Sequence, residues 1–347
     1  MATASRRRTA ASTPQCEGLA RRFRAGVVES MRGFFADHGF LEVDTPLLVP
    51  APGSEAMLDP VVAFNGNDRL GWLITSPEHH MKRLLSDGEQ RIFQLCRCFR
   101  GGERTPHHRV EFTMAEWYRR GADYLQIATD VEELVGRVAA DCTGDTVIPD
   151  GLGGTLDLSP PWTRWTVHDA LVHFAGVELT SPEEGARFAQ GARDAGIASV
   201  EPGDDWETTF YKILIERVEP ALAREGKGVH LLDWPAPMAA LARLKSTDPS
   251  VAERVESYAG GLELSNGFSE LTDPRQQRRR FREERCRRRA RQQSDLPIDE
   301  QFLQGLATGM PDAAGVALGL DRLLLLLSPD HDLRHVAPHF MEHRERE

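Results

Sequence analysis

The stretch from Arg91 to Arg119 constrains the fold most, because it encodes two amphipathic strands joined by a Gly-rich, basic loop. Arg100 closes the first strand, and Glu111 opens the second. Successive side chains of a strand point to opposite faces. One face of the second strand therefore carries an aromatic ring, a thioether, a carboxylate and a phenol: Phe112, Met114, Glu116 and Tyr118.

This face has two interpretations. An aromatic ring, a carboxylate and a phenol beside an arginine can together hold a nucleotide base, an ammonium and a phosphate. A buried hairpin whose glutamate is satisfied by neighbours would show the same alternation. The stretch alone leaves both open.

The composition is that of an ordinary globular protein. The chain has 347 residues, of which 40% are hydrophobic and 27% charged, so one or two domains are expected. The longest apolar run, Leu323 to Leu327, is too short to span a membrane. Residues 1–17 are basic without an apolar segment, which predicts a disordered tail rather than a secretory signal, with a transit peptide as the minor alternative.

Cysteine spacing and net charge exclude several functions. Cys96 and Cys98 lie two apart on a predicted strand, which is not a zinc-ligand spacing, so reduced cytoplasmic thiols are expected. A net charge of −11 gives no overall attraction to nucleic acid. Between residues 275 and 291, however, ten of 17 residues are arginine. This segment is either a solvated helix compensated by Glu283 and Glu284, or a docking patch for an acidic partner or RNA.

Hydrophobic periodicity and turn residues predict the elements. Helices are expected at residues 18–38, 77–85, 124–140 and 298–309, with Ser76 as N-cap and Pro77 at the first helical position of the second. Strands are expected at residues 40–48, 72–75, 91–100, 111–119 and 229–234, and a hairpin at 256–271 with Asn266-Gly267 as its turn or bulge. Residues 51–70 are expected to be a loop, and a mostly helical insertion is expected around 141–226.

This order of elements predicts an α+β fold in which a mostly antiparallel sheet is flanked by helices. The sequence contains neither a GxxxxGK[ST] loop nor a GxGxxG fingerprint. A nucleotide site in this chain would therefore be of neither the P-loop nor the Rossmann type.

Three segments resemble the signature motifs of class II aminoacyl-tRNA synthetases. Residues 39–48 (GFLEVDTPLL) resemble motif 1, the dimer-forming element, and residues 91–119 resemble motif 2. Residues 315–327 (GVALGLDRLLLLL) resemble motif 3, in which a strand turns through Gly319 into a helix that carries Arg322. The resemblance implies one synthetase-like catalytic domain over residues 18–347, and a homodimer.

Within this class the chain is similar to the lysyl-tRNA synthetase catalytic domain, in TSPEHHMKRLL (75–85), FTMAEWY (112–118) and ELSNGFSEL (263–271). Only about 17 residues precede the first helix, too few for an anticodon-binding OB domain of about a hundred residues. The chain resembles the freestanding elongation factor P–(R)-β-lysine ligases over nearly its full length, including GFSELTD (267–273), LPIDE (296–300) and GMPDAAGVALGLDRL (309–323). This implies elongation factor P as protein substrate, with tRNA unlikely.

The resemblance implies an ATP site and a metal site. Arg100 would hold the α-phosphate, Arg322 the γ-phosphate and one face of the adenine, and Phe112 the other face. The implied catalytic residues are Arg100, Arg322 and Glu263, and Mg²⁺ would be held by Glu263 and Glu270, whose oxygens suit a hard cation. The full set implied for ATP is Arg100, Gly101, Gly102, Glu103, Arg109, Phe112, Glu263, Leu264, Gly319 and Arg322.

The substrate implied is lysine or (R)-β-lysine, whose ammonium needs carboxylate partners when buried. The implied pocket comprises Ser76, Pro77, Glu78, Glu116, Tyr118, Asn266, Glu270 and Ala317. Lysyl-tRNA synthetases have glycine where this chain has Ala317. One extra methyl can favour an isomer with a displaced amino group, although such selection is worth only about 1–3 kcal/mol.

The loop after Arg100 departs from the family pattern. Gly102 replaces a carboxylate often used near adenine, for which Glu103 could substitute by a loop shift, and Arg109 either touches ATP or faces solvent. His108 matches the motif's histidine, without support for a general-base role.

Two alternatives to the ligase remain. The first is a truncated lysyl-tRNA synthetase-like enzyme that charges tRNA. The second is a non-catalytic paralogue that senses an amino acid, although a sensor would not need an intact ATP and metal site.

Overall fold

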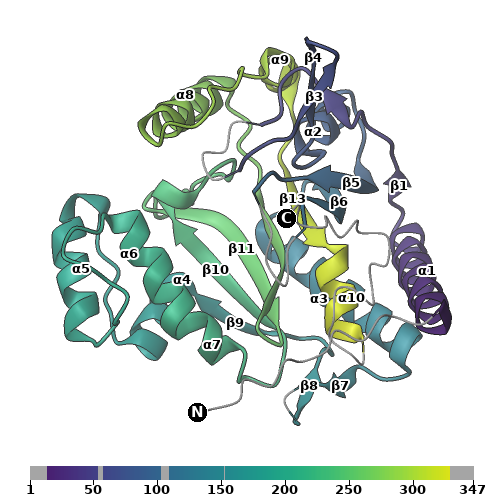
Figure 1. The fold of residues 1–347 in the computed structure, drawn as a ribbon, viewed down its shortest axis with the longest axis horizontal. Helices are drawn as coiled ribbons and strands as arrows, with labels where there is room; N and C mark the ends of the chain where they lie inside the picture. The colour runs from purple at the N-terminus through teal and green to yellow at the C-terminus, as the bar shows by residue number, and fades with distance from the viewer. Residues whose placement is uncertain (1–13, 54–57, 103–108, 152, 329–347) are drawn as a thin grey trace, which may run out of the picture.

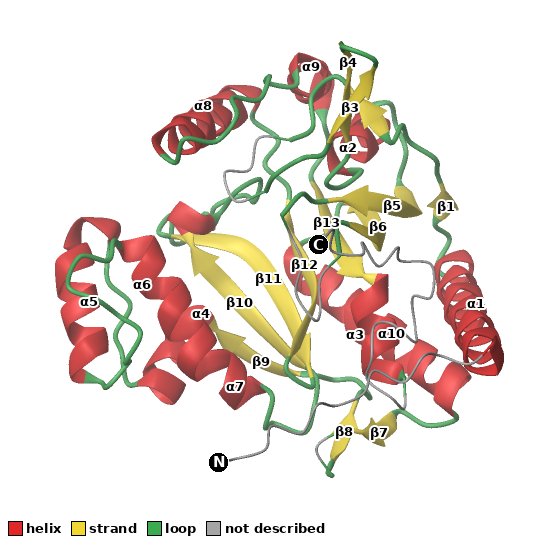
Figure 2. Ribbon diagram, viewed as in Figure 1, coloured by secondary structure: helices red, strands yellow, loops and turns green. Residues whose placement is uncertain are grey.

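The structure is a computed structural model that describes residues 14–53, 58–102, 109–151 and 153–328. Its centre is an eight-stranded sheet in the order β1-β5-β6-β13-β12-β11-β10-β9 (Figures 1 and 2). The strands are β1 (Leu41–Glu42), β5 (Arg91–Phe99), β6 (Glu111–Arg120), β13 (Ala313–Gly319), β12 (Leu262–Ser269), β11 (Val251–Ala259), β10 (Val229–Pro235) and β9 (Thr163–Thr166). The outermost pairs, β1 with β5 and β9 with β10, are parallel and the inner pairs are antiparallel, which confirms the predicted α+β fold.

Three helices cover one face of the sheet: α1 (Pro14–Asp37), α3 (Tyr124–Thr143) and α10 (Leu320–Leu327). Their apolar stripes form the largest core with β6 and β13, in which Phe35 stacks on Phe93 and meets Trp117 edge-on. The first helix starts at Pro14 rather than at the predicted residue 18. Residues 1–13, the rest of the predicted tail, lie outside the described residues. No helix in the described part of the chain is long and apolar enough to cross a membrane.

The opposite face of β5, β6 and β13 is covered by α2 (Glu78–Ser86), α8 (Pro274–Ala290) and α9 (Glu300–Gly309). Alternation along β6 places Trp117 in the first core and Tyr118 in this one, as the pattern predicts. The sheet therefore separates the apolar core beneath α1, α3 and α10 from a second layer that includes the charged side chains near Glu116. Any site built from Glu116 and Tyr118 lies on the side of α2, α8 and α9.

Two segments contain strands where the sequence predicted loop or helix. Residues 51–70, predicted as loop, contain β3 (Val62–Asn65) and the start of β4 (Asp68–Leu73), which pair around Gly66 at φ 60° and join β2 (Leu48–Val49) in a small sheet. The predicted insertion begins with a hairpin, β7 (Val147–Pro149) with β8 (Thr155–Asp157), followed by β9 of the main sheet. Only its remainder is helical, as α4 (Val167–Ala170), α5 (Gly185–Asp194), α6 (Trp206–Ile213), α7 (Glu219–Leu222) and the short π and 3₁₀ turns between them.

The turn of the β11–β12 hairpin lies at Gly260-Gly261, and the prediction of Asn266-Gly267 as its turn is wrong. The two glycines have φ of 57° and 79°, which glycine adopts without a steric penalty. The register shifts at Leu264, so that Glu263 instead of Leu264 lies opposite Tyr258. This bulge brings Glu263 to the same face as Asn266, whereas strict alternation would place it on the other face.

Asp321, the second residue of α10, joins three elements. It accepts a hydrogen bond from Arg24 of α1 (Nη1 to Oδ1, 2.6 Å) and one from the backbone N–H of Thr113 in β6 (2.7 Å). Arg24 also donates to the Thr113 hydroxyl at 2.6 Å. Asp321 is only 6% exposed, so these bonds replace its hydration and fix where α10 begins.

We expect Asp321→Ala to lower the free energy of unfolding by about 2–4 kcal/mol, because it leaves Arg24 and a strand N–H without their acceptor. Urea denaturation measures the change. The control is Asp37→Ala, which removes the exposed Asp37–Arg137 pair and should cost at most about 1 kcal/mol. Equal effects of the two variants would contradict a structural role for Asp321.

Candidate active site

A cavity of about 330 Å³ lies between the sheet, α2 and α8. Among the residues that the sequence predicts for substrate or ATP, those lining it are Ser76, Glu78, Arg100, Glu116, Tyr118, Asn266 and Ala317. The wall also includes Met114, Arg254, Phe268, Arg280 and Phe281, which the prediction omitted. Ala317 lies directly between Glu116 of β6 and Asn266 of β12 in the sheet register, so its methyl group forms part of the floor.

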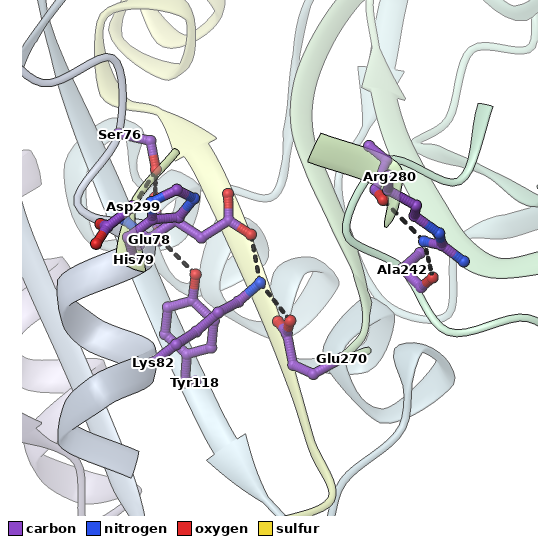
Figure 3. A network of polar contacts seen from close by, with 11 residues as sticks. Ser76, Glu78, His79, Lys82, Tyr118, Ala242, Glu270, Arg280 and Asp299 are labelled. Carbon is purple, nitrogen blue, oxygen red and sulfur yellow. Dashed lines mark hydrogen bonds and ion pairs between the residues drawn. The ribbon is translucent and has the colours of Figure 1, made fainter. Parts of the chain in front are cut away.

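Figure 3 shows the network of polar contacts around Lys82. Only 2% of the Lys82 side chain is exposed. Its Nζ contacts Glu78, four residues earlier on α2, and lies 2.5 Å from Glu270 Oε2. Burial alone would lower the pKa of Lys82, but the carboxylates of Glu270 and Glu78 outweigh burial and raise it. Lys82 is therefore a permanent cation that allows two glutamates to be buried beside it.

Glu116 occupies the centre of the site. Its carboxylate accepts hydrogen bonds from the Tyr118 hydroxyl (2.6 Å) and from Ser76 Oγ (2.9 Å). Burial and the nearby charge of Glu78 raise the pKa of Glu116 to about 8, and burial likewise raises that of Glu270 to about 8. Both carboxyl groups are only 1% exposed, so they depend on neighbouring cations for ionisation.

Around Lys82 the carboxylates outnumber this one ammonium. Glu78, Glu116 and Glu270 converge on it, and the charge of Lys82 lowers the pKa of Glu116 and Glu270 without outweighing burial. A further ammonium placed here would ionise a buried carboxyl group and gain charge-assisted hydrogen bonds. The arrangement suits a primary amine, and Arg100 lies on the same wall.

Gly315 of β13 provides the space that this arrangement needs. A Cβ atom at this position would lie 2.2 Å from Tyr118 Cε1 and 3.0 Å from Glu270 Oε1. Any other residue would displace the tyrosine ring from Glu116. The close packing of Tyr118 against bare backbone explains why glycine stands here.

The helix that carries Glu78 and Lys82 begins differently from the prediction. It starts at Glu78, with Pro77 in the turn before it. The Ser76 hydroxyl accepts the backbone N–H of Glu78 at 3.0 Å while donating to Glu116, so it serves both the helix start and the site.

The residues predicted for ATP lie around the ends of β5, β6 and β13. The Arg100 guanidinium lies 5.1 Å from the Phe112 ring centroid, and Arg322 Nη1 donates to the backbone carbonyl of Glu263 (2.5 Å) and to its carboxylate (3.1 Å). Gly319 ends β13 directly before the helix of Arg322, as predicted. Arg100, Phe112 and Arg322 therefore lie at or near the ends of β5, β6 and β13, which are neighbours in one sheet.

Several predicted ATP residues have other surroundings. Leu264 is 1% exposed within the core beneath α1, α3 and α10, so that its side chain points away from the cavity. Gly101 donates its N–H to the carbonyl of Asp59, and Gly102 has φ 78°. Arg109 is half-buried. Glu103, His107 and His108 lie outside the described residues.

The two predicted metal ligands take different partners. Glu270 is bound to Lys82 below Glu116, whereas Glu263 pairs with Arg322. Glu263 also acts on Glu256 of β11: burial and then the charge of Glu263 raise the pKa of Glu256 to about 7. The described residues contain no group of three or more His, Cys, Asp or Glu side chains close enough to hold a metal by themselves.

Glu256 and Lys82 are the functional candidates that sequence reasoning missed. Glu256 is bound by Arg254 (2.6 Å) and by the Tyr258 hydroxyl (2.7 Å), and it lies opposite Asn266. Its position follows only once the hairpin turn is placed at Gly260-Gly261. Lys82 could have been predicted from the sequence, because a lysine four residues after Glu78 on a helix lies on the same face as that glutamate.

Comparison with known proteins identifies the family to which this fold belongs. The family model described as tRNA synthetases class II (D, K and N) matches residues 12–341. The chain therefore belongs to the class II tRNA synthetase family. Within that class its relatives are of two kinds, which differ in length.

The first kind matches this chain over nearly its whole length. The elongation factor P–(R)-β-lysine ligases of Sodalis glossinidius and Pectobacterium atrosepticum are 39% and 37% identical to it, over 87% of this chain and 89% of each relative. The lysine–tRNA ligase of Dehalococcoides mccartyi is 36% identical over 90% of this chain but only 62% of its own length. The chain thus spans less than two thirds of that longer relative.

Binding of lysine at pH 7 should release about one proton, because a carboxyl group with a pKa of about 8 is mostly protonated there and ionises beside an ammonium. Calorimetric titration in buffers of different ionisation enthalpy measures this release. It should fall towards zero at pH 9, where the group is already ionised, and decrease in Glu116→Gln. Binding at pH 7 without proton release would contradict the assignment.

Proposed function

We propose that this chain is an ATP-dependent ligase that activates (R)-β-lysine, or lysine, as an adenylate and transfers it to the ε-amino group of a lysine on elongation factor P. The observation that carries the proposal is the buried excess of carboxylates around Lys82, next to Arg100 on the same cavity wall. Relatives that match nearly full length carry the corresponding ligase name.

In the first step the carboxylate oxygen of the amino acid attacks the α-phosphorus of ATP, and the bond to the pyrophosphate oxygen breaks. Glu116, Tyr118 and Glu270 would hold the side-chain ammonium, which fixes the far end of the substrate. Arg100 would neutralise the α-phosphate, and Arg322 the terminal phosphates. Catalysis then consists mainly of positioning and charge stabilisation.

The residues present fit a Mg²⁺ ion at the phosphates. Glu256 and Glu263 offer oxygen donors on adjacent strands, and the charge of Glu263 raises the pKa of Glu256, an effect that a divalent cation would offset. We therefore propose Glu256 in place of Glu270 as the partner of Glu263. When bound, the ion would neutralise the charge of the phosphate groups.

In the second step the neutral ε-amine of the acceptor lysine attacks the carbonyl carbon of the adenylate. The bond from that carbon to the phosphate oxygen breaks, AMP leaves, an amide forms and the attacking nitrogen loses a proton. Because the acceptor is a translation factor, we place the enzyme in the cytoplasm.

Charging of tRNA is the second candidate, because lysine–tRNA ligases are also similar to this chain. It is less favoured, because more than a third of the length of each of those relatives is not matched by this chain. Ala317, between Glu116 and Asn266, is a candidate for discrimination between the two amino-acid isomers.

We also propose that the chain forms a homodimer. Large apolar side chains are exposed on α1, β1 and the β2–β4 sheet, which lie along one flank of the molecule in Figure 1. They are Leu19, Leu41, Leu47, Leu48, Val62, Phe64 and Leu70. A second copy would cover this flank, which includes the segment resembling motif 1.

Amino-acid-dependent ATP–pyrophosphate exchange tests the ligase. We expect exchange with (R)-β-lysine, and an increase of about a hundredfold or more in its KM in Glu116→Gln, because the substrate ammonium loses a buried carboxylate. The control is Glu184→Gln in the insertion, away from the cavity, which should leave exchange unchanged. Absence of exchange with either lysine isomer would favour the non-catalytic sensor.

Sedimentation equilibrium tests the dimer. Leu41→Glu with Phe64→Glu should weaken association at least about tenfold, because charges then face the partner subunit. Ile215→Glu is the matched control, since Ile215 is as exposed (60%) as Phe64 (61%) but lies on the insertion. A dimer unaffected by the first pair of substitutions would place the interface elsewhere.

A further inference from the structure

The arginines of α8 have different surroundings, and Arg285, Arg287 and Arg289 pair with nearby acidic side chains. One group fixes the helix to the rest of the protein. Arg278 pairs with Glu300 (2.5 Å), and Arg280 donates to the carbonyls of Ala240 and Ala242 (2.8 and 2.7 Å), the latter labelled in Figure 3. Arg288 is fully buried and donates to the carbonyl of Leu58 at 2.6 Å. These side chains are structural.

The second group faces outward. Arg275, Arg279 and Arg282 are exposed, and their spacing of four and three residues places them on one stripe of the helix. The stripe is about 10 Å long at 1.5 Å per residue. Arg279 is 67% exposed, and its contact with Glu283 is 3.9 Å long, beyond a charge-assisted hydrogen bond. Three guanidinium groups thus point into solvent from a chain whose net charge is −11.

The same helix reaches the cavity with its inner face. Arg280, Phe281, Glu284 and Arg287 line the cavity, opposite Tyr211 of α6. A protein bound along the outer stripe would therefore lie next to the place where its lysine must enter. This proximity links the stripe to the transfer step.

We propose that Arg275, Arg279 and Arg282 form a docking surface for an acidic patch on the protein acceptor of the proposed ligase. The inference rests on the proposed function. Three arginines over about two turns suit a few discrete carboxylates, which arginine binds with a planar fork. An extended RNA backbone is disfavoured, because such binding needs more phosphate contacts than three arginines over about two turns provide.

The test uses the double variant Arg279→Glu with Arg282→Glu, and the matched control Arg187→Glu with Arg224→Glu on the helical insertion, where both arginines are exposed. Three quantities are measured: the Kd for purified elongation factor P by fluorescence anisotropy, the KM for this acceptor, and ATP–pyrophosphate exchange. We expect Kd and KM to rise about tenfold or more in the α8 variant, with exchange and kcat unchanged. Added salt should reduce the difference.

Each outcome is decisive. Unchanged Kd and KM in the α8 variant, or an equal rise in the control, would overturn the docking surface. Weaker binding of a tRNA transcript with unchanged binding of the acceptor would mean that the stripe binds RNA, and would also overturn it. Absence of ATP–pyrophosphate exchange in the unsubstituted protein would overturn the proposed function. The comparison of Kd values between the two double variants would still test the docking surface.

Discussion

The buried ammonium of Lys82 is the interaction on which the site depends. It lies between Glu78 and Glu270, and without it the sheet could not bury these carboxylates next to Glu116. The net effect is a pocket with a deficit of positive charge. Burial is the main reason that the pKa values of Glu116 and Glu270 rise to about 8, and the charge of Glu78 adds to it. An amine substrate could supply the missing positive charge.

Alternation along the strands places the core on one face of the sheet and the charged groups of the site on the other. One face of β6 and β13 packs against α1, α3 and α10, and the other supplies Glu116, Tyr118 and Ala317. Asp321 fixes α10 to β6, and thereby fixes the next residue, Arg322, at the edge of the sheet. The bulge at Leu264 adds Glu263 to the polar face. The sheet therefore positions both Glu116 with Tyr118 and, at its edge, Glu263 with Arg322.

The sequence predicted the parts of the fold and site that depend on local pattern. The strand pair of β5 and β6, the face shared by Glu116 and Tyr118, and the turn from β13 into α10 at Gly319 all follow from periodicity. Register was not predictable, because the apolar pattern of β12 allows a turn at either Gly260-Gly261 or Asn266-Gly267. That ambiguity concealed the position of Glu256 opposite Asn266. The dual role of the α8 arginines also required tertiary contacts, since only these distinguish the structural Arg280 from the outward-facing Arg279.

The central claim is that buried carboxylates select an amino acid with a second ammonium. The most direct measurement is the ratio of ATP–pyrophosphate exchange efficiency (kcat/KM) between (R)-β-lysine and 3-aminohexanoic acid, which lacks the terminal amine. A site built to pair with that amine should favour (R)-β-lysine by about 10⁴-fold, because the analogue leaves buried carboxylates unpaired. Similar exchange with both compounds would contradict the account.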